Sequence, residues 1–381
     1  MIKPNYQNGS IVNLMASIKN ALGGKSLYQP LKDFEISQSQ NIILVIIDGL
    51  GYDYLLKYGK DSFLYKNLKR KMTSVFPATT AAAITTYFTG LPPQQHALTG
   101  WYMYLKEIGA LSLILPFTTR TGNLSLHQGN VNYQDIYNQK TIFENIPVTS
   151  YSVKDKAYIH SDYSRLVDKG ANQLPFSNLN GFFRQIHKAL TTSQDKKYIL
   201  AYWAKFDYLC HKYGTESLET KKHFDELDRK IKLLAKSLVN KNTTLIVSAD
   251  HGLIDVSKEK IIDLKDHPKF TETLAIPLSG EPRAVYCYVR PAKVKQFKKY
   301  VATNFKKYCR LFKSEDLIKR NLFGLFEPNP KLQDRIGDYV LIMKKDYVIK
   351  DQVLGEIQHA NIGRHGGMSH QEMFVPLIII E

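Results

Sequence analysis

The chain has 381 residues, of which 44% are hydrophobic and 23% charged, a composition typical of a soluble globular protein. This length allows one large α/β domain with an inserted subdomain, or two modest domains. The three cysteines, Cys210, Cys287 and Cys309, are too few and too scattered for a disulfide framework or a zinc knuckle, so we expect a reducing compartment.

The net charge is +17, and residues 281–350 hold 17 Lys or Arg against 7 Asp or Glu. This basic segment could attract anionic substrates or polyanions through its long-range field. It could equally be a solvated lysine-rich face. The lysines are spread along the segment without interleaved stacking aromatics, which favours the solvated face but does not exclude nucleic acid.

The N-terminal segment, residues 1–24, has no sustained apolar stretch and predicts an ordinary helix. It resembles neither a signal peptide nor a membrane span. The longest apolar runs, ILVII and PLIII, suit buried strands instead. A cytoplasmic location is therefore the default expectation.

Four short apolar segments predict buried strands, and three of them end in acidic or histidine residues. They are NIILVIIDG, KKYILAYWAKFD, TTLIVSADHG and MFVPLIII. Helical patterns at 179–190 and 219–239 lie between them. Strands that alternate with helices predict an α/β fold with a doubly wound, mostly parallel sheet. In such sheets ligands bind beyond the carboxyl ends of the strands.

Three further segments complete the organisation. Residues 105–135 indicate loop and hairpin, with Gly122 and Asn123 as turn residues. The segment 278–350 combines a strand, a basic helix at 293–309 and a second strand, which indicates a compact α+β insertion. We therefore expect a catalytic α/β core made of residues 1–277 and 351–381, with 278–350 as an inserted basic subdomain.

The strand ends carry residues that suit divalent cations. Asp48 follows the first strand, and Asp250 and His251 follow another, where both can face a cleft. In D-x-x-x-H, Asp207 and His211 lie on one face of a helical turn and can share a zinc ion. Each motif alone also has a plain interpretation, as a surface pair or as a helix cap with a packed imidazole.

Two more segments add a hydroxyl and a histidine. In FPATTAAAITTYFTG, Thr79 and Thr80 stand at the start of a predicted helix, where either can act as an N-cap. Beside a cation, such a hydroxyl would instead become a phosphoryl acceptor. In RHGG, the two glycines make room near His365, which suits a ligand on a tight loop, whereas His370 has a structural interpretation.

These segments, in this order, resemble the type I phosphodiesterase/nucleotide pyrophosphatase family of the alkaline phosphatase superfamily. The match runs from about residue 41 to the C-terminus, and the insertion is its least diagnostic part. The resemblance implies a fold of alkaline phosphatase type. It also implies two divalent metal ions, for which zinc fits the mixed Asp and His ligands best and manganese is possible.

The resemblance further implies which residues act. One metal would be held by Asp48, Thr80, Asp250 and His251, and the other by Asp207, His211 and His365. The family's spacing from the motif proline, Pro77, and from the motif glycine, Gly90, both select Thr80 over Thr79 as nucleophile. Thr80 would attack a phosphodiester or pyrophosphate in line, and water would hydrolyse the phosphothreonine. The expected partner is a small anionic phosphoester or nucleotide.

One departure from the family concerns the substrate. Many members carry an asparagine that contacts a phosphate oxygen, and Trp101 stands about where it falls. Lys205 and Tyr102 are candidate substitutes, and the departure puts nucleotide preference in doubt more than diester chemistry.

Several alternatives stay open at this stage. A phosphomonoesterase and a phosphonate hydrolase of the same superfamily are possible, although no arginine follows Thr80 to bind the extra charge of a monoester. A non-catalytic polyanion-binding protein is a less favoured alternative, because a degenerate scaffold would have lost at least one ligand. The natural substrate and the oligomeric state are not determined by the sequence.

Overall fold

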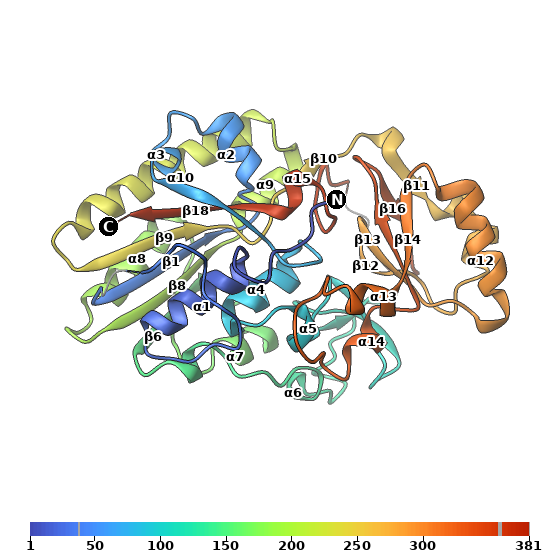
Figure 1. Ribbon diagram of the computed structural model, residues 1–381, viewed down its shortest axis with the longest axis horizontal. Coiled ribbons are helices and arrows are strands. Elements are labelled where there is room, and N and C mark those ends of the chain that lie inside the picture. The colour runs from blue at the N-terminus through green and yellow to red at the C-terminus, as the bar shows by residue number, and fades with distance from the viewer. Residues whose placement is uncertain (37–38, 357–359, 381) are drawn as a thin grey trace.

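The computed structural model describes residues 1–36, 39–356 and 360–380. Two seven-stranded sheets dominate it, and they lie side by side along the long axis of the molecule (Figure 1). The first sheet comprises β1 (Asn41–Ile47), β2 (Leu68–Thr73), β6 (Thr149–Asp155), β7 (Asn172–Phe176), β8 (Lys197–Trp203), β9 (Thr243–Ser248) and β18 (Phe374–Ile380). The second comprises β3 (Tyr102–Leu105), β4 (Ala110–Leu113), β5 (Thr118–Thr119), β12 (Ser279–Glu281), β13 (Ala284–Cys287), β14 (Cys309–Lys313) and β15 (Tyr339–Met343).

The first sheet has the order β2-β18-β9-β1-β8-β6-β7. Its strands are parallel except β18, which runs antiparallel to both of its neighbours. Every residue of β1, β8 and β9 is buried, as expected for central strands that are covered on both faces. The predicted doubly wound, mostly parallel α/β sheet is confirmed.

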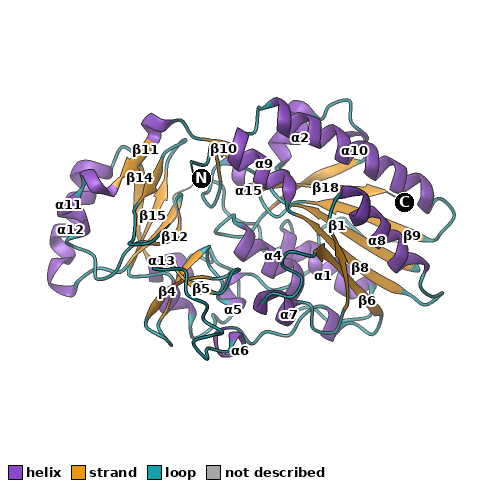
Figure 2. Ribbon diagram, turned by 180° about the vertical axis from the view of Figure 1, so that it is seen from behind, coloured by secondary structure: helices purple, strands orange, loops and turns teal. Residues whose placement is uncertain are grey.

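Helices cover both faces of this sheet (Figures 1 and 2). On one side α1 packs against α4, and on the other side α10 packs against α9 while α8 packs on β6, β7 and β8. Their bounds are α1 (Ile11–Ala21), α2 (Tyr52–Tyr58), α3 (Phe63–Lys66), α4 (Thr80–Thr89), α5 (Pro93–His96), α6 (Tyr133–Ile136), α7 (Asp162–Val167), α8 (Leu179–Thr191), α9 (Lys205–Tyr213) and α10 (Leu218–Leu238). The predicted helices at 179–190 and 219–239 correspond to α8 and α10.

The second sheet is antiparallel, in the order β14-β15-β13-β12-β3-β4-β5. Its strands come from two distant parts of the chain, 102–119 and 279–343. The hairpin expected within 105–135 therefore extends the sheet of the 278–350 segment through one residue pair, Gly280 with Tyr102. Gly122 and Asn123 both have positive φ, as a tight turn requires. The division into a core and an inserted subdomain stays a prediction.

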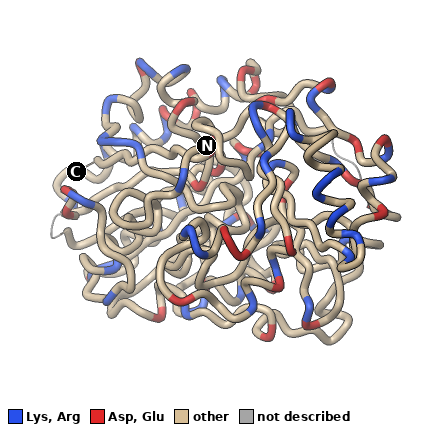
Figure 3. Tube along the Cα trace, turned by 45° about the vertical axis from the view of Figure 1, so that its right-hand side comes forward, with Lys and Arg blue, Asp and Glu red and all other residues tan. Residues whose placement is uncertain are grey.

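Shorter elements complete the second half of the chain. They are α11 (Pro268–Thr271), α12 (Val294–Tyr300), α13 (Ser314–Lys319), α14 (Leu332–Arg335), α15 (His370–Met373), and the strand pairs β10 (Ile254–Asp255) with β17 (Gly363–Arg364) and β11 (Ile261–Asp263) with β16 (Val348–Lys350). The basic helix predicted at 293–309 is α12 followed by a π-helical stretch, Val301–Phe305. Lys and Arg are spread over the visible trace among Asp and Glu (Figure 3). Among the described residues, no helix combines the length and the apolar character needed to cross a bilayer.

Candidate metal centre

The ligand candidates gather at the carboxyl ends of three adjacent strands. Asp48 directly follows β1, and Asp250 and His251 follow β9 after a single residue. Asp207 and His211 lie one turn apart on α9, which begins two residues after β8 ends. Because β9, β1 and β8 are parallel neighbours, their ends meet at one edge of the sheet. Residues about 200 positions apart in the chain thus share one site.

His365 reaches the same edge on the loop that follows β17. Its ring stacks on that of His251, with the centroids 3.9 Å apart, and lies 5.1 Å from the ring of His211. The close packing depends on the next residue, Gly366, whose φ is +102°. A β-carbon there would lie 2.6 Å from Cβ of Glu281, so a side chain would push the loop away from the site.

Two groups of side chains place their ligand atoms within 4.8 Å of one another: Asp48, Asp250 and His251, and Asp207, His251 and His365. In the first, Nε2 of His251 lies 3.3 Å from Oδ1 of Asp48 and 3.4 Å from Oδ2 of Asp250. Beside the second, Nε2 of His211 lies 3.2 Å from Oδ2 of Asp207. The structure therefore brings together all six predicted Asp and His ligands, with His251 between the two groups.

The unpaired atoms of these side chains fit divalent cations. Oδ1 of Asp48, Oδ1 of Asp207, Oδ2 of Asp250 and Nδ1 of His365 are buried and have no hydrogen-bond partner among the described residues. Buried carboxylates without partners are costly in a folded protein. Cations bound at the two groups would satisfy these atoms, and mixed oxygen and nitrogen donors suit zinc. His211 has the orientation of a ligand, since its Nδ1 lies 2.7 Å from the carbonyl oxygen of Gly363 and its Nε2 points toward Asp207.

The protonation of these groups reflects the same crowding. Burial raises the pKa of Asp48 well above its usual value, and repulsion by Asp250 and Asp207 raises it further. Burial also opposes ionisation of Asp207, but attraction by His211 outweighs it and lowers the pKa of that carboxyl. Burial and the charge of His251 lower the pKa of His365 well below its usual value. Nearby divalent cations would favour the ionised carboxylates and the neutral imidazoles that ligation needs.

Tyr202, on β8, orients the first group. Its hydroxyl donates to Oδ2 of Asp48, which leaves Oδ1 of that carboxylate directed toward His251. We expect Tyr202→Phe to weaken binding of one of two zinc ions by about 10- to 100-fold, the usual effect of losing a group that orients a ligand. Zinc titration with a competing chromophoric chelator would measure this.

Tyr198 provides the matched control for that substitution. It lies on the same strand and is also buried, but its hydroxyl has no hydrogen-bond partner among the described residues. Tyr198→Phe should leave zinc affinity unchanged. Equal effects of the two substitutions would contradict the assigned role of Tyr202.

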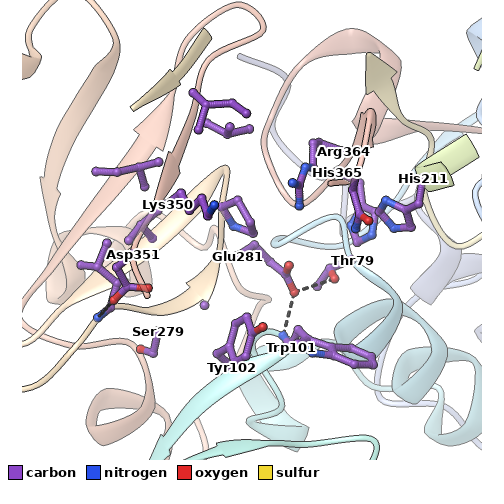
Figure 4. A pocket seen from close by; sticks show the side chains of 18 of the residues that line it. Thr79, Trp101, Tyr102, His211, Ser279, Glu281, Lys350, Asp351, Arg364 and His365 are labelled. Atoms are coloured by element: carbon purple, nitrogen blue, oxygen red, sulfur yellow. Dashed lines mark hydrogen bonds between the residues drawn. The ribbon is translucent and has the colours of Figure 1, made fainter. Parts of the chain in front are cut away.

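The two threonines of the motif face different partners. Thr79 is the N-cap of α4, and its hydroxyl donates to Oε1 of Glu281 over 2.7 Å. Thr80 is the first residue of α4, and its Oγ1 lies 3.2 Å from Nε2 of His251. Thr80 is thus the threonine whose hydroxyl lies beside His251, the residue common to both groups of ligand candidates. Glu281 also accepts the backbone N–H of Trp101, so this carboxylate joins the second sheet to the start of α4 (Figure 4).

A cavity of about 340 Å³ opens from Thr80 toward the second sheet. Asp207, His211 and His365 form part of its wall on the side of the first sheet, and residues of the second sheet, of β11 and of β16 form most of the rest. Figure 4 shows this cavity with Glu281 and Trp101 beside Thr79, and Arg364 beside His365. The arrangement leaves room for a small molecule in contact with the Thr80 hydroxyl.

The two substitutes suggested for the family asparagine lie in different places. Lys205 is exposed and lines a separate cavity with Trp203 and His223. Tyr102 lines the cavity at Thr80, but the guanidinium of Arg120 covers its ring at 4.4 Å.

Sequence reasoning missed Tyr202 and Glu281. A tyrosine inside an apolar strand has the appearance of a core residue, and Glu281 lies in no motif.

Comparison with known proteins identifies the family. The model of the family "Type I phosphodiesterase / nucleotide pyrophosphatase" matches residues 42–368. The chain belongs to this family. Among curated members, it is similar to human ectonucleotide pyrophosphatase/phosphodiesterase family member 5, with 23% identity over 250 residues that cover 60% of the chain and 49% of the relative. It is also similar to rat family member 7, with 26% identity over 201 residues that cover 48% of the chain and 40% of the relative. The chain thus spans half or less of the length of these relatives.

Solved structures of the superfamily share the fold. Murine ectonucleotide pyrophosphatase/phosphodiesterase 5 superposes with a TM-score of 0.67 at 19% identity, over 88% of this chain and 87% of that one. The same murine protein was also solved as an inactive variant in complex with AMP, with a TM-score of 0.65 at 19% identity over 88% and 87%. Phosphonoacetate hydrolase from Sinorhizobium meliloti 1021, in complex with phosphonoformate, superposes with a TM-score of 0.65 at 18% identity, over 89% of each chain. At these identities the likeness shows the fold alone.

Proposed function

We propose that this family member is a metal-dependent phosphodiesterase or nucleotide pyrophosphatase that works through a phosphothreonine at Thr80. One observation carries the proposal. The Thr80 hydroxyl lies 3.2 Å from His251, the histidine common to both groups of ligand candidates, and it opens onto a cavity. Family membership of the chain supports a hydrolase of phosphoric esters.

The residues would hold two divalent cations, most simply zinc with manganese as the alternative. One would be bound by Asp48, Thr80, Asp250 and His251, and the other by Asp207, His211 and His365. When bound, they supply Lewis-acid charge that lowers the pKa of a nearby hydroxyl and offsets the charge of a phosphoryl group. The protein's own part is to hold the carboxylates and imidazoles in place through Tyr202, Gly363 and the strand ends.

The reaction then has two steps at one phosphorus atom. Thr80 Oγ1 loses its proton to solvent and attacks phosphorus, so a P–Oγ1 bond forms while the bond from phosphorus to the leaving oxygen breaks, and the leaving oxygen takes up a proton from solvent. Water next attacks the phosphothreonine: its oxygen bonds to phosphorus as the P–Oγ1 bond breaks, and one of its protons returns to Oγ1 to restore the Thr80 hydroxyl. Thr80 is well placed for this role, because the N-terminal end of α4 favours negative charge.

Two named relatives bear on the substrate. The murine protein in complex with AMP is described as an inactive variant in which a threonine is replaced by alanine, which supports a threonine nucleophile and a nucleotide-like substrate here. The resemblance to phosphonoacetate hydrolase supports a second candidate, hydrolysis of a phosphonate. A phosphomonoesterase has less support, because no arginine follows Thr80 to bind the extra charge of a monoester. A non-catalytic polyanion-binding protein has less support, because every ligand candidate is present.

Metal dependence and substrate preference test the proposal together. Zinc-loaded protein should hydrolyse bis-p-nitrophenyl phosphate faster than p-nitrophenyl phosphate, and chelation should lower the diester rate by at least about 100-fold, since the metals supply several kcal/mol of stabilisation. Added zinc should restore the rate. Preference for the monoester would instead indicate a phosphatase. Protein that binds two zinc ions and hydrolyses neither ester would contradict a general diesterase.

A further inference from the structure

Two cationic side chains of the cavity at Thr80 have no hydrogen-bond or ion-pair partner among the residues that the structure describes. Arg364 and Lys350 both line the cavity at Thr80. Nε of Arg364 is buried without a hydrogen bond, and neither side chain makes an ion pair or hydrogen bond with the residues that the structure describes. A buried guanidinium N–H without an acceptor is costly in a folded protein. An anion in the cavity would offset this cost.

A third cation in the same cavity shows the contrast. The guanidinium of Arg120 lies 2.5 Å from Asp351 and 2.9 Å from Glu356, and it also donates to the carbonyl oxygen of Leu278. Two carboxylates therefore neutralise Arg120, and it has a structural role in joining the hairpin to the loop after β16. The carboxylates of Asp351 and Glu356 are thereby occupied.

Two fully buried arginines elsewhere in the described residues are paired with carboxylates. Arg283 contacts Glu372, and Arg335 contacts Glu107. The segment 357–359, which lies outside the described residues, has the sequence Ile-Gln-His and offers no carboxylate. Glu281 shares the cavity, but its Oε1 already accepts from Thr79 and Trp101. Arg364 is thus a partly buried cation that has no ion pair among the described residues and that lines the cavity at Thr80.

We infer that Arg364 and Lys350 form a subsite for a second anionic group of the substrate, beside the phosphoryl group that reacts at Thr80. The inference rests on the proposed function and deepens it. Arg364 directly precedes His365 and lies beside it (Figure 4), so the second anion would be close to the reacting phosphorus. A guanidinium binds carboxylate or phosphate through two parallel hydrogen bonds, and Lys350 adds a point charge.

The surroundings strengthen this attraction. Ile261, Val348 and Ile349 line the same cavity and keep part of its wall apolar, which raises the effective strength of a charge pair. The substrate class is therefore a small phosphate ester or phosphonate with a carboxylate or a second phosphate near its phosphorus. An alkyl diester without such a group would lose this contact.

Binding of three phosphonates to zinc-loaded protein tests the subsite separately from ester hydrolysis, and the probes recovered after each titration are checked for cleavage. Phosphonoacetate carries a carboxylate beside its phosphonate, phosphonoacetamide has a neutral amide in place of that carboxylate, and methylenediphosphonate has a second phosphonate. Isothermal titration calorimetry on the wild type should show at least about tenfold tighter binding of one or both probes with a second anionic group than of the amide, as expected for one charge-assisted pair. Which probe binds more tightly distinguishes a carboxylate from a phosphate.

Substitutions then assign the preference to the two cations. Arg364→Gln and, to a smaller extent, Lys350→Gln should reduce the preference for the probes with a second anionic group, while the affinity for phosphonoacetamide stays the same. Arg364→Lys should retain part of the preference. Arg184→Gln is the matched control, because Arg184 is an exposed arginine on α8 that lines none of the cavities described. Zinc content is measured for each variant.

Three results would overturn the subsite. The first is equal wild-type affinity for the amide and for both probes with a second anionic group. The second is a preference that survives in both Arg364→Gln and Lys350→Gln. The third is affinity that falls equally for all three probes in these variants while their zinc content matches that of the wild type. A preference lost in these variants, in a protein that hydrolyses no ester, would instead keep the subsite and reject the proposed function.

Discussion

Thr80→Ala is expected to lower the turnover of a phosphodiester by at least about 10³-fold, because removal of a nucleophile leaves only the remaining electrostatic stabilisation. Zinc-loaded variant protein, assayed with bis-p-nitrophenyl phosphate at saturating concentration, would measure this loss. The variant should still bind a zinc ion at the site proposed for Asp207, His211 and His365, since Thr80 is not one of the ligands proposed for that ion. Thr80→Ser keeps a hydroxyl and should retain part of the activity.

Thr79 offers a control one residue away on the same helix. Its hydroxyl donates to Glu281 instead of adjoining His251, so Thr79→Ala should lower turnover by only about tenfold, the effect of one lost hydrogen bond. Phosphopeptide mapping after an acid quench should find the phosphoryl group on Thr80. A phosphoryl group on Thr79, or a loss in Thr79→Ala as large as that in Thr80→Ala, would reject the assignment.

The sequence predicted the core sheet and the place where the ligand candidates meet. Strands such as β1 and β9 are short and have apolar centres, and Asp48 or Asp250 and His251 follow them within three residues. The pattern alone therefore shows that the ligand candidates lie at the carboxyl ends of these strands. Parallel pairing then brings their ends together, whatever the separation in the chain. The family resemblance added Thr80 and the division of the ligands between two metals, and both stay predictions.

The second sheet could not be predicted in full, because its strands are short and come from distant segments. β3 and β4 have four residues each, and their hairpin joins the rest of the sheet through one residue pair between Gly280 and Tyr102. No local pattern specifies a pairing of this kind. Tyr202 and Glu281 were missed for a related reason, since each acts only through a partner on another segment, Asp48 and Thr79 respectively.

Arg364 shows a different limit. It lies within RHGG, next to a predicted ligand, yet the sequence gives no sign that it lacks a carboxylate partner. That feature depends on where every acidic residue of the second sheet lies, as the pairing of Arg120 with Asp351 and Glu356 illustrates. An excess of positive charge along a segment predicts an electrostatic field around it. Whether a single cationic side chain has an acidic partner can be seen only in the folded structure.

Glu372→Gln is expected to destabilise the protein by about 3–5 kcal/mol, because it leaves the guanidinium of Arg283 buried and uncompensated. Nε of Arg283 lies 2.7 Å from Oε1 of Glu372 and Nη2 lies 2.9 Å from Oε2, and neither side chain is more than 1% exposed. The pair joins the second sheet to α15. Urea unfolding, with the midpoint and slope compared with the wild type, would measure the loss.

The same carboxylate also holds the loop that carries His365. Glu372 accepts the backbone N–H of Gly367 and of Ser369, so its loss should weaken zinc binding as well as stability. A β-carbon on Gly367 would lie 2.8 Å from Oε2 of Glu372, which explains why the second glycine of RHGG is needed. Arg283→Met should destabilise the protein too, and the double variant should lose less than the sum of the two, because the residues act as one unit.

The pH dependence separates this ion pair from ordinary packing. Burial alone would raise the pKa of Glu372, but attraction by Arg283 and the hydrogen bonds outweigh it and lower that pKa below its usual value of 4.5. A lowered folded-state pKa contributes stability that is present above about pH 4.5 and is lost as the pH falls through the folded-state value. The stability difference between wild type and Glu372→Gln should therefore shrink below that pH.

Glu216→Gln, which breaks an exposed pair with Lys57, should change stability little at any pH, because solvent screens such pairs. A difference for Glu372→Gln that does not depend on pH would mean that the residue acts through packing, and that the buried charge of Arg283 is compensated in another way.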